Sequence, residues 1–288
     1  MQAKSGVFSP VGKTVFIDFD GTYAHNGVIP AAHVEAVRRA QRNGHRVLLC
    51  TGRPKALVAA DDVAVFDGLV AAAGGYVEVD GQVLADRRFP AYLAARIVEL
   101  LEAYRGVYIL EGPDAAYVTP AARQRLIDLL TTGEHAASFG EAADGILAPL
   151  LITDDPAAES FAKVTCFDLL VPAARLATEL APEIGVVPSS IGSLGDKAGE
   201  FFLAEVNKSV GIAVVERHFG LDRADIVAIG DSHNDLEMVA YAGTGVAIEG
   251  GVPELLALAD LVVPTPEQAG LVVAFERLGL IDSPVRAA

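Results

Sequence analysis

Two aspartates stand directly after an apolar run near the start of the chain. The stretch VFIDFDGT, residues 15–22, separates Asp18 from Asp20 by one residue. Residues two apart in a strand point to the same side, and the carboxyl ends of parallel strands face the crevice where open α/β sheets bind ligands. An Asp-Gly turn alone would account for Asp20 but not for Asp18, which needs a cation or hydrogen-bond donors to remain ionised beside apolar neighbours.

A second apolar run ends in carboxylates far along the chain. The stretch DIVAIGDSHNDLEM, residues 225–238, contains Asp231 and Asp235 after a run typical of a buried strand. Four acids at adjacent strand ends would repel one another, and a divalent cation relieves that repulsion. Carboxylates, a main-chain carbonyl and waters form an oxygen-only ligand set that suits Mg²⁺. Helix capping by Asp231 or Asn234 is the alternative interpretation, and capping is compatible with metal binding.

Two further segments could hold an anion. The stretch VLLCTGRP, residues 47–54, ends with Thr51 and Gly52, whose hydroxyl and backbone N–H groups precede a helical turn opened by Pro54. Lys208 follows an apolar segment and opens a helical pattern, whereas an ordinary lysine lies on a solvated helix face. These segments predict donors and a cation for an anionic group beside the acids.

The elements that must position these residues alternate between strand and helix. Helical patterns that end in glycine occur at 31–44 and 234–243. Short aliphatic runs typical of buried parallel strands occur at both ends of the chain, at 15–17, 47–50, 226–229 and 245–248. This alternation predicts an α/β fold whose core is a doubly wound parallel sheet.

The middle of the chain has a different pattern, with amphipathic helices, strand candidates and proline-containing breaks. We interpret residues 87–188 as an inserted α+β cap domain. The core is then discontinuous and consists of residues 1–86 and 189–288. Glycine-containing segments at 81–86 and 188–192 are the expected hinges of the insert.

Composition limits the classes of protein and partner. The 288 residues are 52% apolar and carry a net charge of −16 without a cluster of basic residues, so we expect no nucleic-acid partner. We find neither a membrane-spanning apolar stretch nor a signal peptide, and therefore expect no membrane partner and a cytoplasmic location. Cys50 and Cys166 lie within apolar runs and are predicted to be buried packing residues. The histidines lack metal-ligand spacing.

Four stretches in chain order resemble the four motifs of the haloacid dehalogenase superfamily of phosphatases. They are DFDGT (18–22), CTGR (50–53), NK (207–208) and GDSHND (230–235). With AGTGVAI (242–248) and the insert between the second and third motifs, the chain is similar to the Cof-type branch. It departs from that branch at Phe19 and Tyr23, where leucines are usual, and at Gly250 and Gly251, where Asn and Ala are usual.

The resemblance implies a role for each matching residue. Asp18 would be the nucleophile, Asp20 the general acid and base, and Thr51 and Lys208 ligands of the phosphoryl group. Asp18, Asp231 and the Asp20 carbonyl would bind Mg²⁺, with Asp235 also at the metal. The further phosphate or substrate contacts would be Phe19, Gly52, Arg53 and Asn234.

The expected activity is Mg²⁺-dependent removal of phosphate from a small phosphorylated metabolite, preferably a sugar phosphate, through an aspartyl phosphate. A phosphomutase with the same core remains open, because it differs only in the acceptor of the phosphoryl group. A phospho-acceptor signalling domain needs neither an insert of this length nor a second acid two residues from the nucleophile. A catalytically idle binding protein is a further alternative. We expect a monomer or a small homo-oligomer.

Overall fold

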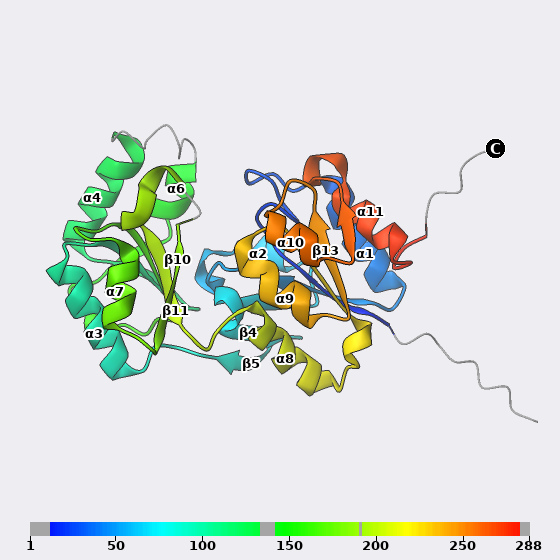
Figure 1. The fold of residues 1–288 in the computed structure, drawn as a ribbon, viewed down its shortest axis with the longest axis horizontal. Helices are drawn as coiled ribbons and strands as arrows, with labels where there is room; N and C mark the ends of the chain where they lie inside the picture. Colours follow the sequence, from blue (N-terminus) through cyan, green and yellow to red (C-terminus); the bar gives the residue numbers. More distant parts are fainter. Residues whose placement is uncertain (1–11, 133–141, 190–191, 283–288) are drawn as a thin grey trace, which may run out of the picture. The chain divides into compact units, whose positions relative to one another are not determined.

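The computed structural model describes residues 12–132, 142–189 and 192–282, and the chain forms two compact units (Figure 1). The first unit consists of Met1–Cys50, Ala64–Leu69 and Ile212–Ala288. The second consists of Thr51–Val63 and Val70–Gly211. The short segment 51–63 therefore clusters with the middle of the chain.

The first unit is built on parallel strands. The strand order is β14-β13-β12-β1-β2, and each neighbouring pair is parallel. The strands are β1 (Thr14–Ile17), β2 (Arg46–Cys50), β12 (Ile226–Gly230), β13 (Thr244–Ile248) and β14 (Leu261–Val263). Their residues are largely buried, as expected for a parallel sheet covered on both faces. The four strands predicted from aliphatic runs are all present, and the α/β fold class is confirmed.

Amphipathic helices cover this sheet. In α1 (Ala31–Arg42) the buried residues His33, Ala36, Val37 and Ala40 recur at helical spacing. The other helical elements are α9 (Leu236–Tyr241), α10 (Pro253–Leu258), α11 (Gly270–Arg277), η5 (Arg223–Asp225), η6 (His233–Asp235) and η7 (Pro266–Gln268). Helix α8 (Lys208–Phe219) begins in the second unit and continues into the first.

The second unit contains a mixed six-stranded sheet in the order β10-β11-β9-β6-β7-β8. All neighbours are antiparallel except β7 and β8. Helices α3 and α7 pack on one face, and α4 and α6 on the other. The strands are β6 (Val107–Glu111), β7 (Ala116–Val118), β8 (Leu150–Ile152), β9 (Lys163–Asp168), β10 (Ile184–Pro188) and β11 (Gly199–Leu203). The helical elements are α3 (Ala91–Ala103), α4 (Pro120–Thr131), α6 (Ala142–Leu147), α7 (Ala173–Glu179), η3 (Pro156–Ala158) and η4 (Gly192–Lys197).

The rest of the second unit lies around the segment 51–63. This segment contains η1 (Lys55–Leu57) and α2 (Ala60–Val63). Strand β3 (Gly68–Ala71) starts in the first unit and ends in the second, where η2 (Ala72–Gly74) and the antiparallel hairpin of β4 (Tyr76–Val79) and β5 (Gln82–Asp86) follow it.

The predicted hinge at 81–86 is wrong. Asp80 and Gly81 form the turn of the β4–β5 hairpin with positive φ angles, and residues 82–86 are strand β5. The second predicted hinge, at 188–192, includes residues 190 and 191, which lie outside the described part of the chain. Strand β10 ends at Pro188 and pairs with β11, which begins at Gly199. The mixed sheet thus extends to Leu203, beyond the predicted end of the insert at residue 188. The domain boundaries themselves stay a prediction.

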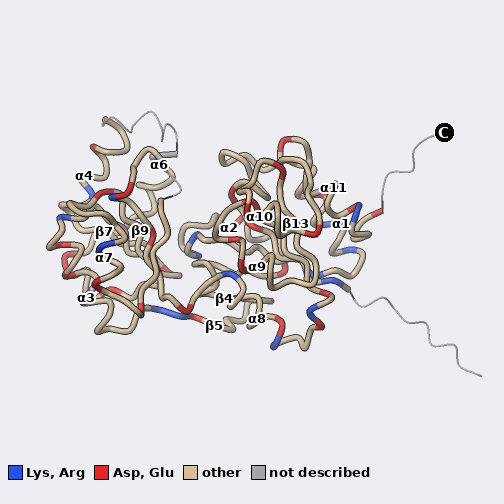
Figure 2. Tube along the Cα trace, viewed as in Figure 1, with Lys and Arg blue, Asp and Glu red and all other residues tan. Residues whose placement is uncertain are grey.

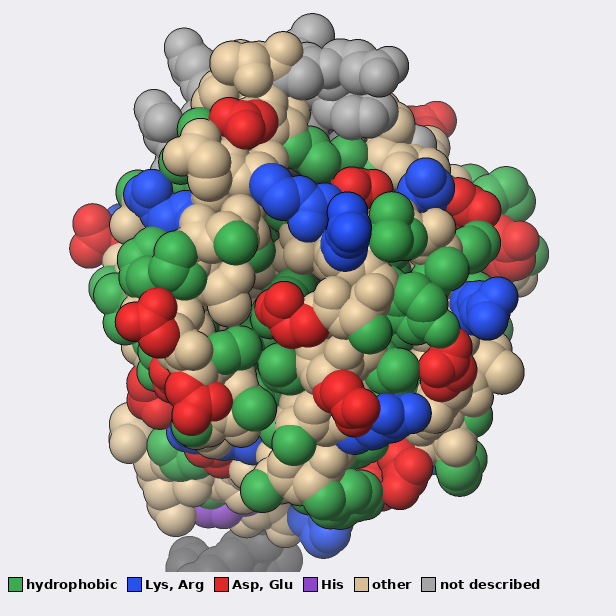
Figure 3. All heavy atoms as spheres, turned by 90° about the vertical axis from the view of Figure 1, so that its left-hand side faces the viewer, with side chains coloured by type: hydrophobic (Ala, Val, Ile, Leu, Met, Phe, Trp, Pro, Cys, Tyr) green, Lys and Arg blue, Asp and Glu red, His purple; other side chains and the backbone are tan. Residues whose placement is uncertain are grey.

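Acidic and basic residues occur along the chain in both units (Figure 2). On the face of the second unit in Figure 3, acidic, basic and hydrophobic side chains are interspersed. Within the described residues, no helix has both the length and the apolar character needed to span a bilayer. Cys50 and Cys166 are both buried, as predicted.

Candidate active site

Strand β1 positions Asp18 at the carboxyl end of the parallel sheet. The Asp18 N–H donates to the carbonyl of Ile229 on β12 at 2.9 Å, which extends the pairing of the two strands by one residue. Only 4% of Asp18 is exposed, whereas Asp20 is exposed to solvent. The two acids therefore occupy different environments although one residue separates them.

The turn after Asp20 holds Asp231, the first residue after β12. The Thr22 hydroxyl donates to Asp231 Oδ1 at 2.7 Å. Gly21 has a φ of +89°, and a Cβ at this position would lie 2.4 Å from Asp231 Oδ2. Gly21 is therefore required both by its backbone conformation and by this close approach. Gly21 and Thr22 belong to the DFDGT motif but were not predicted as site residues.

Asp235 is completely buried and fixes the turn after β12. Its Oδ2 accepts hydrogen bonds from the backbone N–H groups of Asp231 and Ser232, each at 3.0 Å. The exposed Asn234 accepts a hydrogen bond from the Ser232 hydroxyl at 2.8 Å. Asp235 thus accepts from two backbone N–H groups at this turn, and the capping box that it forms with Ser232 opens the following helical turn.

The carboxylates of Asp18, Asp231 and Asp235 converge. Each offers one oxygen, and the three oxygens lie within 4.8 Å of one another. Such a hard, anionic donor set fits a small divalent cation such as Mg²⁺. Asp20 is not part of this group of carboxylates, and its predicted ligand atom is the main-chain carbonyl.

In the second unit, backbone hydrogen bonds hold the loop after β2. The Thr51 N–H donates to the Val70 carbonyl at 2.8 Å, and the Thr51 carbonyl accepts from Ala73 N–H at 3.1 Å. Thr51 Oγ1 accepts from the backbone N–H of Arg53, also at 3.1 Å. Thr51 is buried, while Gly52 and Arg53 are partly exposed. The loop therefore fixes the position of the Thr51 hydroxyl.

Lys208 is completely buried at the first position of α8. Asn207 caps this helix, because its Oδ1 accepts hydrogen bonds from Val210 N–H at 3.2 Å and from the Ser209 hydroxyl at 2.7 Å. Lys208 therefore differs from an ordinary lysine on a solvated helix face, and a buried ammonium requires polar partners.

The structure thus brings Asp18, Asp231 and Asp235 together in the first unit, with Asn234 in the same turn. Phe19 is buried in this unit, where its ring lies 6.1 Å from that of Tyr23, so its side chain contributes to packing. In the second unit Thr51, Gly52 and Arg53 form one loop.

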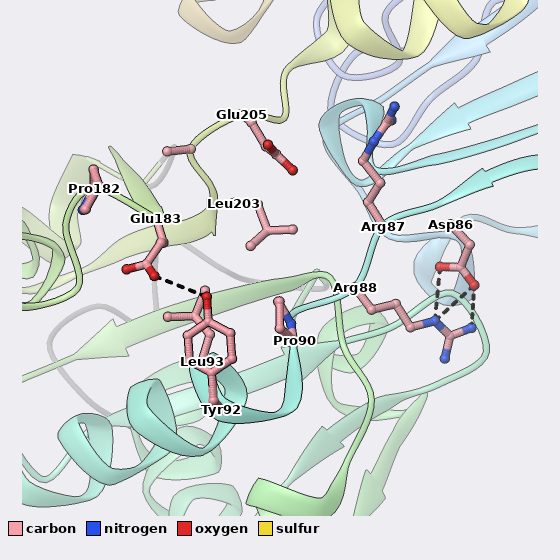
Figure 4. Close-up of a pocket in the computed structure, with 11 residues that line it drawn as sticks. Asp86, Arg87, Arg88, Pro90, Tyr92, Leu93, Pro182, Glu183, Leu203 and Glu205 are labelled. Atoms are coloured by element: carbon pink, nitrogen blue, oxygen red, sulfur yellow. Dashed lines mark hydrogen bonds and ion pairs between the residues drawn. The ribbon is translucent and has the colours of Figure 1, made fainter.

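An open cavity of about 560 Å³ lies in the second unit (Figure 4). None of the predicted site residues lines it. Arg88 forms ion pairs with Asp86 and Asp114, and Glu183 accepts a hydrogen bond from Tyr92. These groups therefore already have protein partners, and we assign no ligand to the cavity.

The first unit contains a parallel sheet with carboxylates clustered at its strand ends, and the second unit contains a mixed sheet from the middle of the chain. A sequence profile of the haloacid dehalogenase-like hydrolases matches residues 15–275. The chain therefore belongs to this family, and it is an enzyme of the Cof-type phosphatase branch.

Individual relatives cover nearly the whole chain. YkrA of Bacillus subtilis (strain 168) is 27% identical over 278 residues, covering 93% of this chain and 98% of YkrA. YwtE of the same organism, named 5-amino-6-(5-phospho-D-ribitylamino)uracil phosphatase, is 25% identical over 285 residues, covering 92% of this chain and 98% of YwtE. The solved structure of BT4131, described as a subclass IIB sugar phosphatase, has a TM-score of 0.74 at 21% identity and covers 93% of this chain and 100% of BT4131. This last similarity concerns the fold.

Proposed function

We propose that the chain is a Mg²⁺-dependent phosphomonoesterase that transfers the phosphoryl group of a small metabolite to Asp18 and then to water. The observation that carries this proposal is the convergence of Asp18, Asp231 and Asp235 at the ends of neighbouring parallel strands. The membership of the family and the phosphatase names of relatives support the same conclusion.

Asp18, Asp231 and Asp235, with the main-chain carbonyl of Asp20, would hold the metal ion. A bound Mg²⁺ supplies positive charge that reduces the repulsion between a carboxylate nucleophile and a phosphate dianion. Asp235 also binds two backbone N–H groups, so its position does not depend on the metal alone.

The chain's own residues would carry out two successive displacements. An Asp18 carboxylate oxygen forms a bond to phosphorus while the bond to the leaving oxygen breaks, and Asp20 gives its proton to that oxygen. Asp20 then takes a proton from water as the water oxygen attacks phosphorus and releases Asp18. The exposure of Asp20 suits a group that exchanges protons with solvent. Thr51 and Lys208 would hold the phosphoryl oxygens.

The proposed substrate class is a phosphate on a polyhydroxylated carbon chain, with sugar phosphates preferred. BT4131 is described as a sugar phosphatase, and the name of YwtE specifies a phosphorylated ribityl chain. Hydroxyl groups on the leaving group are the chemical feature that these two substrates share.

The test is phosphate release from a panel of phosphomonoesters with Mg²⁺ and with excess chelator. The panel contains hexose phosphates, ribitol 5-phosphate, flavin mononucleotide, pyridoxal phosphate and 4-nitrophenyl phosphate. We expect chelator to abolish release and Asp18→Asn to reduce kcat at least about 10³-fold, because the nucleophile is lost. The exposed Glu254→Gln is the matched control and should retain wild-type rates.

Undiminished hydrolysis in excess chelator would contradict the metal-dependent mechanism. Wild-type rates in Asp18→Asn would contradict the covalent step. Movement of phosphate to another position of the substrate, without release of inorganic phosphate, would identify a phosphomutase instead.

A further inference from the structure

A lysine and two glutamates lie on adjacent strands of the six-stranded sheet. Lys163 on β9 is the register partner of Glu111 on β6, while Glu200 on β11 faces Thr165, two residues along β9. The Lys163 ammonium lies 2.7 Å from the Glu200 carboxylate and 3.5 Å from that of Glu111. Lys163 is 8% exposed and Glu111 is 4% exposed. These charges are therefore largely removed from water, which is costly unless they hold one another.

The ammonium of Lys163 also makes a contact outside the sheet. It donates to the carbonyl oxygen of Gly52 at 3.3 Å. Leu57, later in the same segment, packs against the hydrophobic cluster that contains Ile109, two residues before Glu111 on β6. Side chains two apart on a strand share a face, so both contacts involve the same face of the sheet. The segment 51–63 is thus attached to this sheet at two points.

The Gly52 carbonyl belongs to the same peptide unit as the Arg53 N–H. That N–H donates to Thr51 Oγ1 at 3.1 Å. Because the peptide unit is planar, a hydrogen bond that fixes the carbonyl also fixes the direction of the N–H. A continuous series of contacts therefore connects the two glutamates to Lys163, Lys163 to the Gly52–Arg53 peptide unit, and this peptide unit to the Thr51 hydroxyl.

This series of contacts determines the direction in which the Thr51 hydroxyl can donate its proton. A hydroxyl has one proton to donate and two acceptor lone pairs. The Arg53 N–H occupies an acceptor position, so the hydroxyl proton must point in a different direction, where it can be donated to an oxygen of a bound anion. If the peptide unit rotated, this orientation would be lost even though Thr51 itself remained.

We propose that Lys163 is a positioning residue for Thr51: Glu111 and Glu200 hold its ammonium, and the ammonium fixes the Gly52–Arg53 peptide unit that orients the Thr51 hydroxyl toward the phosphoryl group. The proposal rests on the proposed function, because only that function makes Thr51 a ligand of a phosphoryl group. It assigns a task in phosphoryl transfer to a residue of the inserted region that touches no reacting atom.

A double-mutant cycle on 4-nitrophenyl phosphate tests this proposal, since its compact leaving group limits contacts with the insert. Lys163→Met alone could prevent folding by leaving glutamates buried without a cation. The test therefore uses the combination Glu111→Gln, Lys163→Met, Glu200→Gln, which removes all three charges and is called the charge-neutral variant. We expect it to lower kcat/KM about tenfold, and Thr51→Val to lower kcat/KM about 10²-fold. All four substitutions together should be no worse than Thr51→Val within about twofold, because Lys163 acts through Thr51. The exposed Lys197→Met is the control and should change nothing.

Hydrogen exchange provides a readout that does not depend on turnover. Backbone amides in the segment 50–57 should exchange about tenfold faster in the charge-neutral variant than in the wild type, because the loop loses its attachment to the sheet. Unchanged exchange there would overturn the proposal. The proposal would also be overturned if the wild type is active and the loss of kcat/KM in the variant with all four substitutions equals the product of the two separate losses. This outcome would leave the proposed function intact. A wild type that hydrolyses no phosphomonoester overturns the proposed function, and the positioning role with it.

Discussion

The two units hold their buried carboxylates in different ways. In the first unit Asp18, Asp231 and Asp235 form a group of like charges, with Asp231 and Asp235 held by hydroxyl and backbone N–H donors. In the second unit the group formed by Glu111, Lys163 and Glu200 contains its own cation. A group of like charges attracts an exchangeable cation, whereas a group with an internal cation is suited to a permanent structural contact.

The titration properties of the second group agree with a permanent contact. Burial opposes the charge of Lys163, but the two glutamates outweigh this effect and raise the pKa of its ammonium. Burial also raises the pKa of the Glu111 carboxyl, and Lys163 offsets this only in part. Glu200, at 2.7 Å and with a quarter of its side chain exposed, is therefore the main ionic partner of Lys163.

The largest effect should follow Asp231→Asn, which removes one charge from the group of like charges. Loss of a metal ligand should lower kcat/KM at least about 10³-fold, because a metal ion supplies several kcal/mol of charge stabilisation. In chelator the thermal midpoint should stay equal or rise, since repulsion is relieved while the asparagine Oδ1 can still accept from Thr22. Addition of Mg²⁺ should raise the midpoint of the wild type but not that of the variant.

The control for this measurement is Glu254→Gln, which should respond to Mg²⁺ as the wild type does. A clear loss of stability of Asp231→Asn in chelator would show that the carboxylate serves the fold, and the contrast between the two groups would then be lost.

Removal of Lys163, the internal cation of the second group, should destabilise the fold, in contrast to Asp231→Asn. Lys163→Met leaves Glu111 buried without a counter-charge and should lower the free energy of unfolding of the second unit by about 3–5 kcal/mol. The charge-neutral combination with Glu111→Gln and Glu200→Gln should recover most of this loss. Denaturant unfolding measures both effects, with Lys197→Met as the control. Equal stability of Lys163→Met and the wild type would show that the ammonium is dispensable.

The sequence predicts the first group far better than the second. Asp18 and Asp231 each end an aliphatic run, and the carboxyl ends of neighbouring parallel strands meet at one edge of a sheet. Nothing in the local pattern relates Lys163 to Glu111 or Glu200, because antiparallel pairing brings them together from three distant strands. Periodicity identifies a strand but not its partner, and for this reason the assignment of β11 to the mixed sheet was also missed.

The β4–β5 hairpin was also not predicted, although the sequence contains a local signal for its turn. Asp80 and Gly81 form an Asp-Gly pair between alternating segments, which is typical of a tight hairpin turn with positive φ at both central residues. The interpretation of Gly81 as part of a hinge left strands β4 and β5 unpredicted. Flexibility is only one use of glycine, and the left-handed backbone of a turn is another.

The smallest effect concerns the pH dependence of stability through Glu111. Because burial raises its pKa in the folded protein, Glu111 keeps its proton to a higher pH there than in the unfolded chain, where the value is 4.5. Between these two pKa values the folded state binds more protons, so its stability falls as pH rises. Glu111→Gln lacks this dependence, and its stability relative to the wild type should increase from pH 4 to pH 7, by about 1.4 kcal/mol for each pKa unit separating the two states. Unfolding curves at several pH values measure the difference, with the exposed Glu205→Gln as the control. If the stability of the wild type relative to Glu111→Gln instead increases as pH rises, Glu111 is a stabilising ionised partner of Lys163. The Lys163 ammonium would then be shared between two carboxylates and not held mainly by Glu200.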